Sequence, residues 1–174
     1  MKRLEDQLSM YAMYHRDIRN IWTHFVGIPM IVLAVVILLS RPQIQINEWM
    51  ATPARALLLM VAIYYIFLNV KLGLAMAALL SLSVFAAEQI AVLPTGEWLT
   101  WGVSLFVVGW IIQFIGHYWE GKKPAFFDDI RGLLIGPLFV MVEALFLMGF
   151  LKILQSTISL RAGEVINKSA KQVD

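Results

Sequence analysis

A nearly uncharged stretch of about forty residues, 53–93, restricts the fold of this chain more than any other feature. At about 1.5 Å per residue, one helix of this length would be twice as long as the roughly 30 Å hydrocarbon layer of a membrane. The polar interruption in its middle is the segment 69–73, which contains Asn69 and Lys71. The stretch is therefore predicted to fold into a helical hairpin, with spans at about 53–70 and 73–93.

Three further stretches are apolar enough to cross a membrane, namely 21–40, 98–117 and 133–154. Apolar residues make up 60% of the 174-residue chain and charged residues 15%, whereas soluble domains have about 25% charged residues. A soluble monomer of this size could not bury so much apolar surface. The predicted fold class is therefore all-α, a polytopic membrane bundle of five transmembrane helices preceded by an N-terminal amphipathic helix.

The domain organisation follows from the same pattern. We expect one membrane-embedded domain, 1–154, and a polar C-terminal tail, 155–174, that forms a surface helix because it is too polar to span. With the N-terminus in the cytoplasm, eight basic residues fall on the cytoplasmic side and two on the other side, when the tail is set aside. The N-terminus is polar and mixed in charge, so no cleavable secretory signal is visible.

The three histidines of the chain, His15, His24 and His117, are the main candidates for chemistry. With five spans, His24 opens the first span and His117 closes the fourth, so both are expected at the cytoplasmic face. His15 falls on an apolar stripe that begins at Leu4 and recurs every three or four residues as far as Ile18. The topology therefore predicts that all three imidazoles gather at one membrane interface.

This gathering requires a break in the helix between the first two histidines. His15 and His24 are nine residues apart, which would put them on opposite sides of one continuous helix. We expect the break at 17–20, with Asn20 as the N-cap of the first span. Arg16 and Asp17 lie off the apolar stripe, so they are expected on the polar side of the N-terminal helix.

Polar residues that accompany the histidines limit the chemistry of the site. Gln113, His117 and Glu120 are spaced by four and three residues, so they can share one helical face. Three imidazoles with a nearby carboxylate and amide suit Fe(II), Mn(II) or Zn(II), and three protein ligands leave positions for substrate and dioxygen. A haem held between His24 and His117 is also consistent with the ligand types. Interfacial histidines without any ligand are a further alternative, and spacing alone does not decide between them.

Other charged residues carry weaker indications. Glu143 lies inside the fifth predicted span, where an ionised carboxylate costs on the order of 3 kcal/mol. It either supports a metal ligand through hydrogen bonding or takes part in helix packing. Arg16, Arg19, Lys122 and Lys123 are predicted to form a basic rim that contacts lipid phosphates or pairs with a substrate carboxylate. The net charge of +2 argues against a nucleic-acid partner, and the absence of cysteine excludes thiolate metal sites.

Two segments of the chain resemble the signatures of one membrane enzyme family. The first comprises a Tyr-His pair, an asparagine, a second histidine and a Gly/Pro turn, at Tyr14, His15, Asn20, His24, Gly27 and Pro29. The second surrounds the third histidine and continues into the fifth span, at Gln113, His117, Glu120, Lys123, Pro124, Gly136, Pro137 and Glu143. With these residues the chain resembles the membrane-bound, Fe(II)-dependent 2-hydroxy fatty acid dioxygenases, over residues 11–149. Phe126 and Phe127 depart from the leucine expected after the second signature.

The resemblance implies a helical membrane fold, Fe(2+) as cofactor and the α-oxidation of 2-hydroxy fatty acids. In that reaction a 2-hydroxy fatty acid and O2 give the fatty acid one carbon shorter, CO2 and water, without an external reductant. The residues it implies as iron ligands and catalytic groups are His15, His24, His117 and Glu120, with Glu120 as a fourth ligand or as a base outside the metal sphere. The residues expected to bind substrate or orient the ligands are Asn20, Gln113, Arg16 and Lys123, with Glu143 supporting the ligands from outside the metal sphere.

The expected partners are therefore a 2-hydroxy fatty acid, O2 and the lipid bilayer, and no nucleic acid. The small size and short loops favour a bacterial inner membrane, with the N-terminus and the site on the cytoplasmic side. Two alternatives from other functional classes stay open, a non-catalytic lipid-binding membrane protein and a haem-binding membrane protein.

Overall fold

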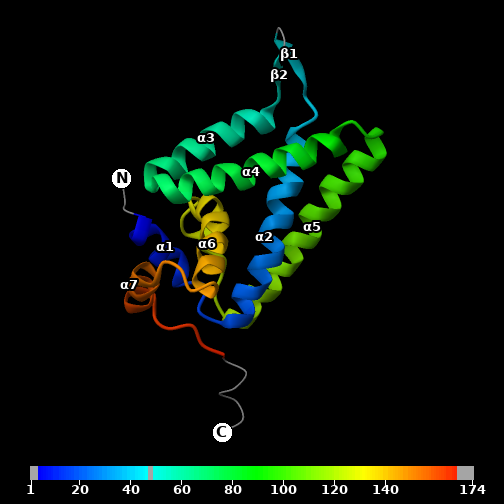
Figure 1. Ribbon diagram of the computed structural model, residues 1–174. Coiled ribbons are helices and arrows are strands. Elements are labelled where there is room, and N and C mark those ends of the chain that lie inside the picture. The colour runs from blue at the N-terminus through cyan, green and yellow to red at the C-terminus, as the bar shows by residue number, and fades with distance from the viewer. Residues whose placement is uncertain (1–3, 47–48, 168–174) are drawn as a thin grey trace. The chain divides into compact units, whose positions relative to one another are not determined.

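The computed structural model describes residues 4–46 and 49–167, and α-helix dominates them, which confirms the predicted fold class. The elements in chain order are α1 (Leu4–Ala12), α2 (Ile18–Leu39), β1 (Ile44–Ile46), β2 (Trp49–Ala51), α3 (Pro53–Leu68), α4 (Val70–Ala91), α5 (Thr95–Glu120), the short 3-10 helix η1 (Ala125–Phe127), α6 (Gly132–Leu147) and α7 (Lys152–Ala162) (Figure 1). The antiparallel pair β1–β2 is an addition that the hydropathy pattern did not indicate. The chain divides into two compact units, one formed by residues 1–28 and 110–174 and the other by residues 29–109.

The helical hairpin predicted between residues 53 and 93 is present, and Asn69 is the residue at which it turns. Asn69 is extended and separates α3 from α4, and its side chain accepts a hydrogen bond from Leu72 N at 3.0 Å. At the other end of α3, Thr52 Oγ1 accepts from Arg55 N at 3.1 Å, and Pro53 occupies the first helical position. Polar caps thus set the start of α3 and the start of α4 within an otherwise apolar stretch.

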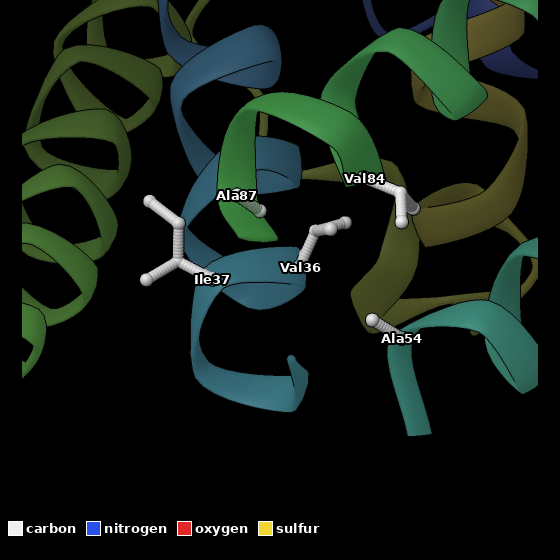
Figure 2. Close-up of a cluster of buried hydrophobic side chains, with 5 residues drawn as sticks. All are labelled: Val36, Ile37, Ala54, Val84 and Ala87. Atoms are coloured by element: carbon white, nitrogen blue, oxygen red, sulfur yellow. The ribbon is translucent and has the colours of Figure 1, made fainter. Parts of the chain in front are cut away.

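The core of the unit formed by residues 29–109 joins three helices through small and β-branched side chains. Figure 2 shows these buried residues, which are Val36 and Ile37 of α2, Ala54 of α3, and Val84 and Ala87 of α4. Trp98 of α5 packs against this core, and its Nε1 donates a hydrogen bond to Ile37 O at 2.9 Å.

Helices α3 and α4 approach each other closely at Gly73. A Cβ atom on this residue would lie 2.5 Å from Ile66 N and 2.6 Å from Tyr65 C, which are backbone atoms of α3. Gly73→Ala is therefore expected to destabilise the protein by roughly 1–3 kcal/mol, the usual cost of overpacking, measured as a lower melting temperature in detergent. Gly96→Ala is the control, because no described atom lies within 4 Å of the added Cβ. Equal melting temperatures for the two variants would contradict the close approach.

Three of the helices, α2, α4 and α5, are long and apolar enough to cross a membrane. α6 and α7 pass the same test only as a pair, which is bent by 117° at the break between them. α3 and α6 have 16 residues each, or about 24 Å, and are shorter than the roughly 30 Å hydrocarbon layer. Four of the five predicted spans are thus single helices and the fifth, 133–154, is broken after Leu147, while by length and apolarity the described residues provide three full crossings, or up to four.

In the unit formed by residues 1–28 and 110–174, α1 packs against α6 and α7, so that helices from the two ends of the sequence lie side by side (Figure 1). The apolar stripe of α1 is buried at Leu4, Leu8 and Tyr11, as predicted. The helix ends at Ala12, however, earlier than expected. The prediction that Arg16 and Asp17 lie on the polar side of this helix is therefore wrong, because both residues follow the end of α1 and are buried.

Candidate metal centre

The three histidines lie together in the unit formed by residues 1–28 and 110–174, as the sequence predicted. One potential ligand nitrogen of each ring lies within 4.8 Å of those of the other two, and all three side chains are buried. The ring centroids are 4.3 Å apart for His15 and His24, 4.9 Å for His15 and His117, and 5.0 Å for His24 and His117. Within residues 4–46 and 49–167, no second group of three or more histidine or carboxylate ligands has this arrangement.

His15 lies in the loop between α1 and α2 and is held from the α1 side. Its Nδ1 is 2.8 Å from Tyr11 O, and its ring stacks on the Tyr11 ring with 4.2 Å between centroids and 8° between planes. The Phe139 ring of α6 also lies beside the His15 ring, with 5.6 Å between the ring centroids. Burial, reinforced by His24 and His117, lowers the pKa of His15 well below its ordinary value of 6.5. The imidazole is therefore neutral, which is the form that binds metal ions.

His24 lies in the second turn of α2, and its Nδ1 is 2.8 Å from Asn20 O. In both His15 and His24 a backbone carbonyl lies beside Nδ1, and a carbonyl can only accept a hydrogen bond. We therefore assign the ring hydrogen to Nδ1 in both residues, which leaves a lone pair on each Nε2. The two Nε2 atoms are 2.9 Å apart, so in the neutral rings two lone pairs face each other with no hydrogen between them.

A shared cation removes this conflict. Two imidazole nitrogens bound at about 2.1 Å to one ion, at right angles to each other, lie about 3.0 Å apart. The observed 2.9 Å between His15 Nε2 and His24 Nε2 is close to that separation. The donor set, with a third buried imidazole nearby, therefore fits a divalent transition-metal ion.

Helix α5 contributes His117, and Gly116 allows α5 to approach α2 at this level. A Cβ atom on Gly116 would overlap Thr23 Oγ1 and Asn20 Oδ1. Gln113 lies one turn before His117 and is 4% exposed. Its Nε2 and Asn20 Oδ1 are buried polar atoms without a hydrogen-bond partner among the described residues. Since an unpartnered buried polar group costs about 1–3 kcal/mol, these two atoms are available to a polar ligand or a water molecule.

Glu120, predicted as a fourth ligand, has other partners in the structure and is not part of the histidine group. Its Oε2 accepts hydrogen bonds from Arg16 N at 2.9 Å, Asp17 N at 2.7 Å and Asn20 Nδ2 at 3.2 Å. These donors belong to the loop that carries His15 and to the first turn of α2. The buried carboxylate of Glu120 thus holds this loop, and its negative charge is favourable beside a helix N-terminus.

The N-cap of α2 differs from the prediction. Asp17, which is fully buried, is the N-cap, because its Oδ1 accepts a hydrogen bond from Arg19 N at 3.0 Å. Asn20, the predicted cap, lies within the first turn of α2, and its Nδ2 also donates to Tyr14 O at 3.2 Å. The Asn20 side chain therefore links the loop before α2 to Glu120 of α5.

Arg16 is buried rather than part of an exposed basic rim. Its Nε donates to Ala12 O at 2.8 Å and to His15 O at 2.9 Å, and its Nη1 donates to Gly163 O at 2.8 Å. Its Nη2 is 3.8 Å from Glu143 Oε1, so Glu143 supports the residue next to His15. These contacts occupy Nε and Nη1 of the guanidinium group, whereas Nη2 is buried without a hydrogen-bond partner among the described residues.

Lys123 is the most exposed of the predicted substrate-binding residues, with 59% of its side chain exposed. It pairs with Asp128, which also accepts a hydrogen bond from Tyr14 Oη at 2.7 Å. A pocket of about 210 Å³ opens beside this pair and is lined by Tyr11, Tyr14, Asp128 and Ile135 among others. Tyr11 lines this pocket and also stacks its ring on His15.

Comparison with known proteins assigns the chain to a family. Residues 1–148, which include all three histidines, match the family described as 2-hydroxy-palmitic acid dioxygenase Mpo1-like. The chain belongs to the Mpo1-like family. A relative in this family is the 2-hydroxy-palmitic acid dioxygenase MPO1 of Saccharomyces cerevisiae, which is 31% identical over 159 residues, or 89% of this chain and 87% of the yeast protein. No solved structure matches the chain. The resemblance seen in the two histidine signatures is thus confirmed, and the Mpo1-like match ends one residue after α6.

Proposed function

We propose that this Mpo1-like chain is an Fe(II)-dependent dioxygenase that converts a 2-hydroxy fatty acid and O2 into the fatty acid one carbon shorter, CO2 and water. The observation that carries the proposal is the pair of Nε2 lone pairs of His15 and His24, 2.9 Å apart and next to the ring of His117. The name of the yeast relative, a 2-hydroxy-palmitic acid dioxygenase, supports the substrate class.

The ligand types favour iron for this chemistry. His15, His24 and His117 would hold the ion, and three neutral imidazoles suit divalent ions of intermediate softness. Zinc binds the same ligands but has no redox chemistry, whereas a dioxygenase needs a metal that exchanges electrons with O2. Bound Fe(II) would supply this redox chemistry, and three protein ligands leave room for substrate and O2 at the ion.

The two unpartnered amide atoms match the polar groups of a 2-hydroxy acid. Gln113 Nε2 is a buried donor, suited to a substrate carboxylate oxygen, and Asn20 Oδ1 is a buried acceptor, suited to the 2-hydroxyl hydrogen. We propose that these two groups orient the reacting end of the substrate, which raises the rate by fixing its position beside the histidines. Glu120 in this proposal fixes the His15 loop and does not bind the metal.

The surroundings of the site favour an amphiphilic substrate. His24 lies near the N-terminal end of α2 and His117 near the C-terminal end of α5, and both helices are apolar enough to span a membrane. We propose that the histidine group lies at the cytoplasmic face of a bacterial inner membrane, so that the polar end of a fatty acid reaches it while the acyl chain stays among the lipids.

The test is metal analysis and turnover by the purified full chain in detergent. Stoichiometric iron is expected, together with release of labelled CO2 from 2-hydroxypalmitic acid labelled at its carboxyl carbon and equimolar uptake of O2. Chelation is expected to stop the reaction, and Fe(II), but not Zn(II), to restore it. A Soret absorption band would support haem binding instead, and lipid binding without metal or turnover would support the non-catalytic alternative.

A further inference from the structure

The chain that follows α7, residues 163–166, runs along the loop that carries His15. Ile18 N donates a hydrogen bond to Ile166 O at 3.0 Å, and Ile166 N donates to Arg16 O at 2.8 Å, which makes a short parallel bridge. Arg16 Nη1 donates to Gly163 O at 2.8 Å. We call residues 163–166 the C-terminal strap, because these three hydrogen bonds fasten it to the residues on either side of Asp17.

Helix α7 positions the C-terminal strap beside the loop that carries His15. α7 packs against α1, its Ile158 is 2% exposed, and its Arg161 pairs with Asp6 of α1 at 2.7 Å. Gly163 ends α7 with φ at 88°, a conformation that favours glycine and lets the chain leave the helical direction. Both α7 and the strap lie beyond residue 148, where the family match ends.

His15 depends on such support more than the other two histidines do. His24 and His117 lie within α2 and α5, whose own backbone hydrogen bonds fix them, whereas His15 lies in a loop. The next residue, Arg16, has its N–H bound by Glu120 and its carbonyl oxygen bound by the strap. The loop is thus held between a carboxylate of α5 and the C-terminal strap.

We infer that the C-terminal strap is a positioning segment that sets the place of His15 and thereby the metal affinity of the histidine group. The inference rests on the proposed function, since it assumes that the three histidines bind a metal ion. Ligands must be held to within about 0.5 Å for tight binding, and partners outside the metal sphere typically change affinity 10–100-fold. Loss of the strap is therefore expected to weaken metal binding although no strap residue touches the metal.

The experiment compares Ile166→Pro with Ile166→Val in the full chain, using Co(II) as the probe. Proline lacks the N–H that donates to Arg16 O, and valine keeps it. Visible absorption titration in detergent, at a temperature at which both variants are folded, measures Co(II) affinity and ligand geometry. Ile166→Pro is expected to bind Co(II) at least about tenfold more weakly and with an altered spectrum, and Ile166→Val to bind as the unmodified chain does. Unchanged affinity in Ile166→Pro would overturn the inference.

Two further backgrounds test whether the strap acts through His15. In a His15→Ala chain, Ile166→Pro is expected to have no further effect on Co(II) affinity, because the residue it positions is gone. In a His24→Ala chain, titrated at Co(II) concentrations high enough to reach its weaker two-imidazole site, the loss caused by Ile166→Pro is expected to persist. The same loss in both backgrounds would show a general structural effect and would also overturn the inference.

A metal-independent readout separates this inference from the proposed function. If the unmodified chain binds no Co(II), the proposed metal centre fails, and the strap is judged by hydrogen exchange of the peptide covering residues 13–20. Faster exchange of this peptide in Ile166→Pro than in Ile166→Val, with no change in a peptide from α4, supports positioning of the loop. Equal exchange in the two variants overturns it.

Discussion

Alanine at His24 is expected to abolish iron binding and CO2 release by the purified protein. The change removes one of three imidazole ligands and leaves the Nε2 of His15 without the nitrogen that lies 2.9 Å away. Since changes outside the metal sphere already cost 10–100-fold in affinity, loss of a ligand is expected to cost more than about 100-fold. Iron content after dialysis and the rate of CO2 release from labelled 2-hydroxypalmitic acid measure the effect, and the same result is expected at His15 and His117.

The matched control for this series is Tyr118→Ala. Tyr118 follows His117 in α5, but its side chain is 82% exposed, so its removal leaves the histidine group intact. Each variant is checked for native helix content by circular dichroism, so that loss of metal is not confused with unfolding. A folded His24→Ala protein with full iron content and activity would refute the metal centre.

Glu120→Ala is expected to be the most damaging substitution for stability. Its Oε2 accepts hydrogen bonds from Arg16 N, Asp17 N and Asn20 Nδ2, and all three residues are buried. Without the carboxylate, Arg16 N and Asp17 N lose this acceptor at about 1–3 kcal/mol each, whereas Asn20 Nδ2 keeps Tyr14 O, so a loss of at least about 2 kcal/mol is expected. For a chain of this length that corresponds to a melting temperature lower by about 4–8 °C, measured in detergent.

Glu120→Gln distinguishes a residue that holds the loop from a metal ligand. The amide oxygen of glutamine can still accept hydrogen bonds. We therefore expect Glu120→Gln to lower the melting temperature much less than Glu120→Ala does, and to keep a metal affinity within a few-fold of that of the unmodified chain. A variant with an unchanged melting temperature and no bound iron would instead make Glu120 a ligand. Glu97→Ala serves as the control, because Glu97 is an exposed carboxylate on the same helix and its loss is expected to change stability by less than about 0.5 kcal/mol.

The sequence was sufficient to predict the helices and the meeting of the histidines because both depend on long-range regularities. The length of the stretch 53–93 required a hairpin, and Asn69 was the polar residue at which it could turn. Given that hairpin, His24 and His117 had to come to the same face. These arguments use only the thickness of a bilayer and the rise of a helix.

The structure of the loop around His15 could not be predicted in the same way. Apolar residues keep a helical spacing through this segment as far as Ile18, although α1 ends at Ala12. The buried backbone N–H groups of Arg16 and Asp17 are accepted by Glu120, which is 104 residues away from Arg16 in the sequence. Periodicity reports local conformation and contains no information about such a distant acceptor.

The end of α6 shows a second limit of sequence patterns. The apolar stretch 133–154 predicted one span, but α6 ends at Leu147 and the chain bends by 117° before α7. Gly149 with φ at 84° is a recognisable place for such a break. Leu151, with φ at 55°, could not be recognised from the sequence as part of the break, because residues with a side chain rarely adopt this conformation and no sequence rule assigns it to leucine.

The hydrogen bond between Arg16 and Glu120, which spans 104 residues, has a consequence for the newborn protein. During synthesis on the ribosome, α1 and the first half of α2 emerge long before α5, so the partly made chain carries two imidazoles and no complete cage for an ion. Under the proposed function, binding of iron by all three imidazoles would therefore begin only after α5 has been made. Oxygen chemistry in the shorter chain, with its risk of damage to surrounding lipids, would be delayed until then.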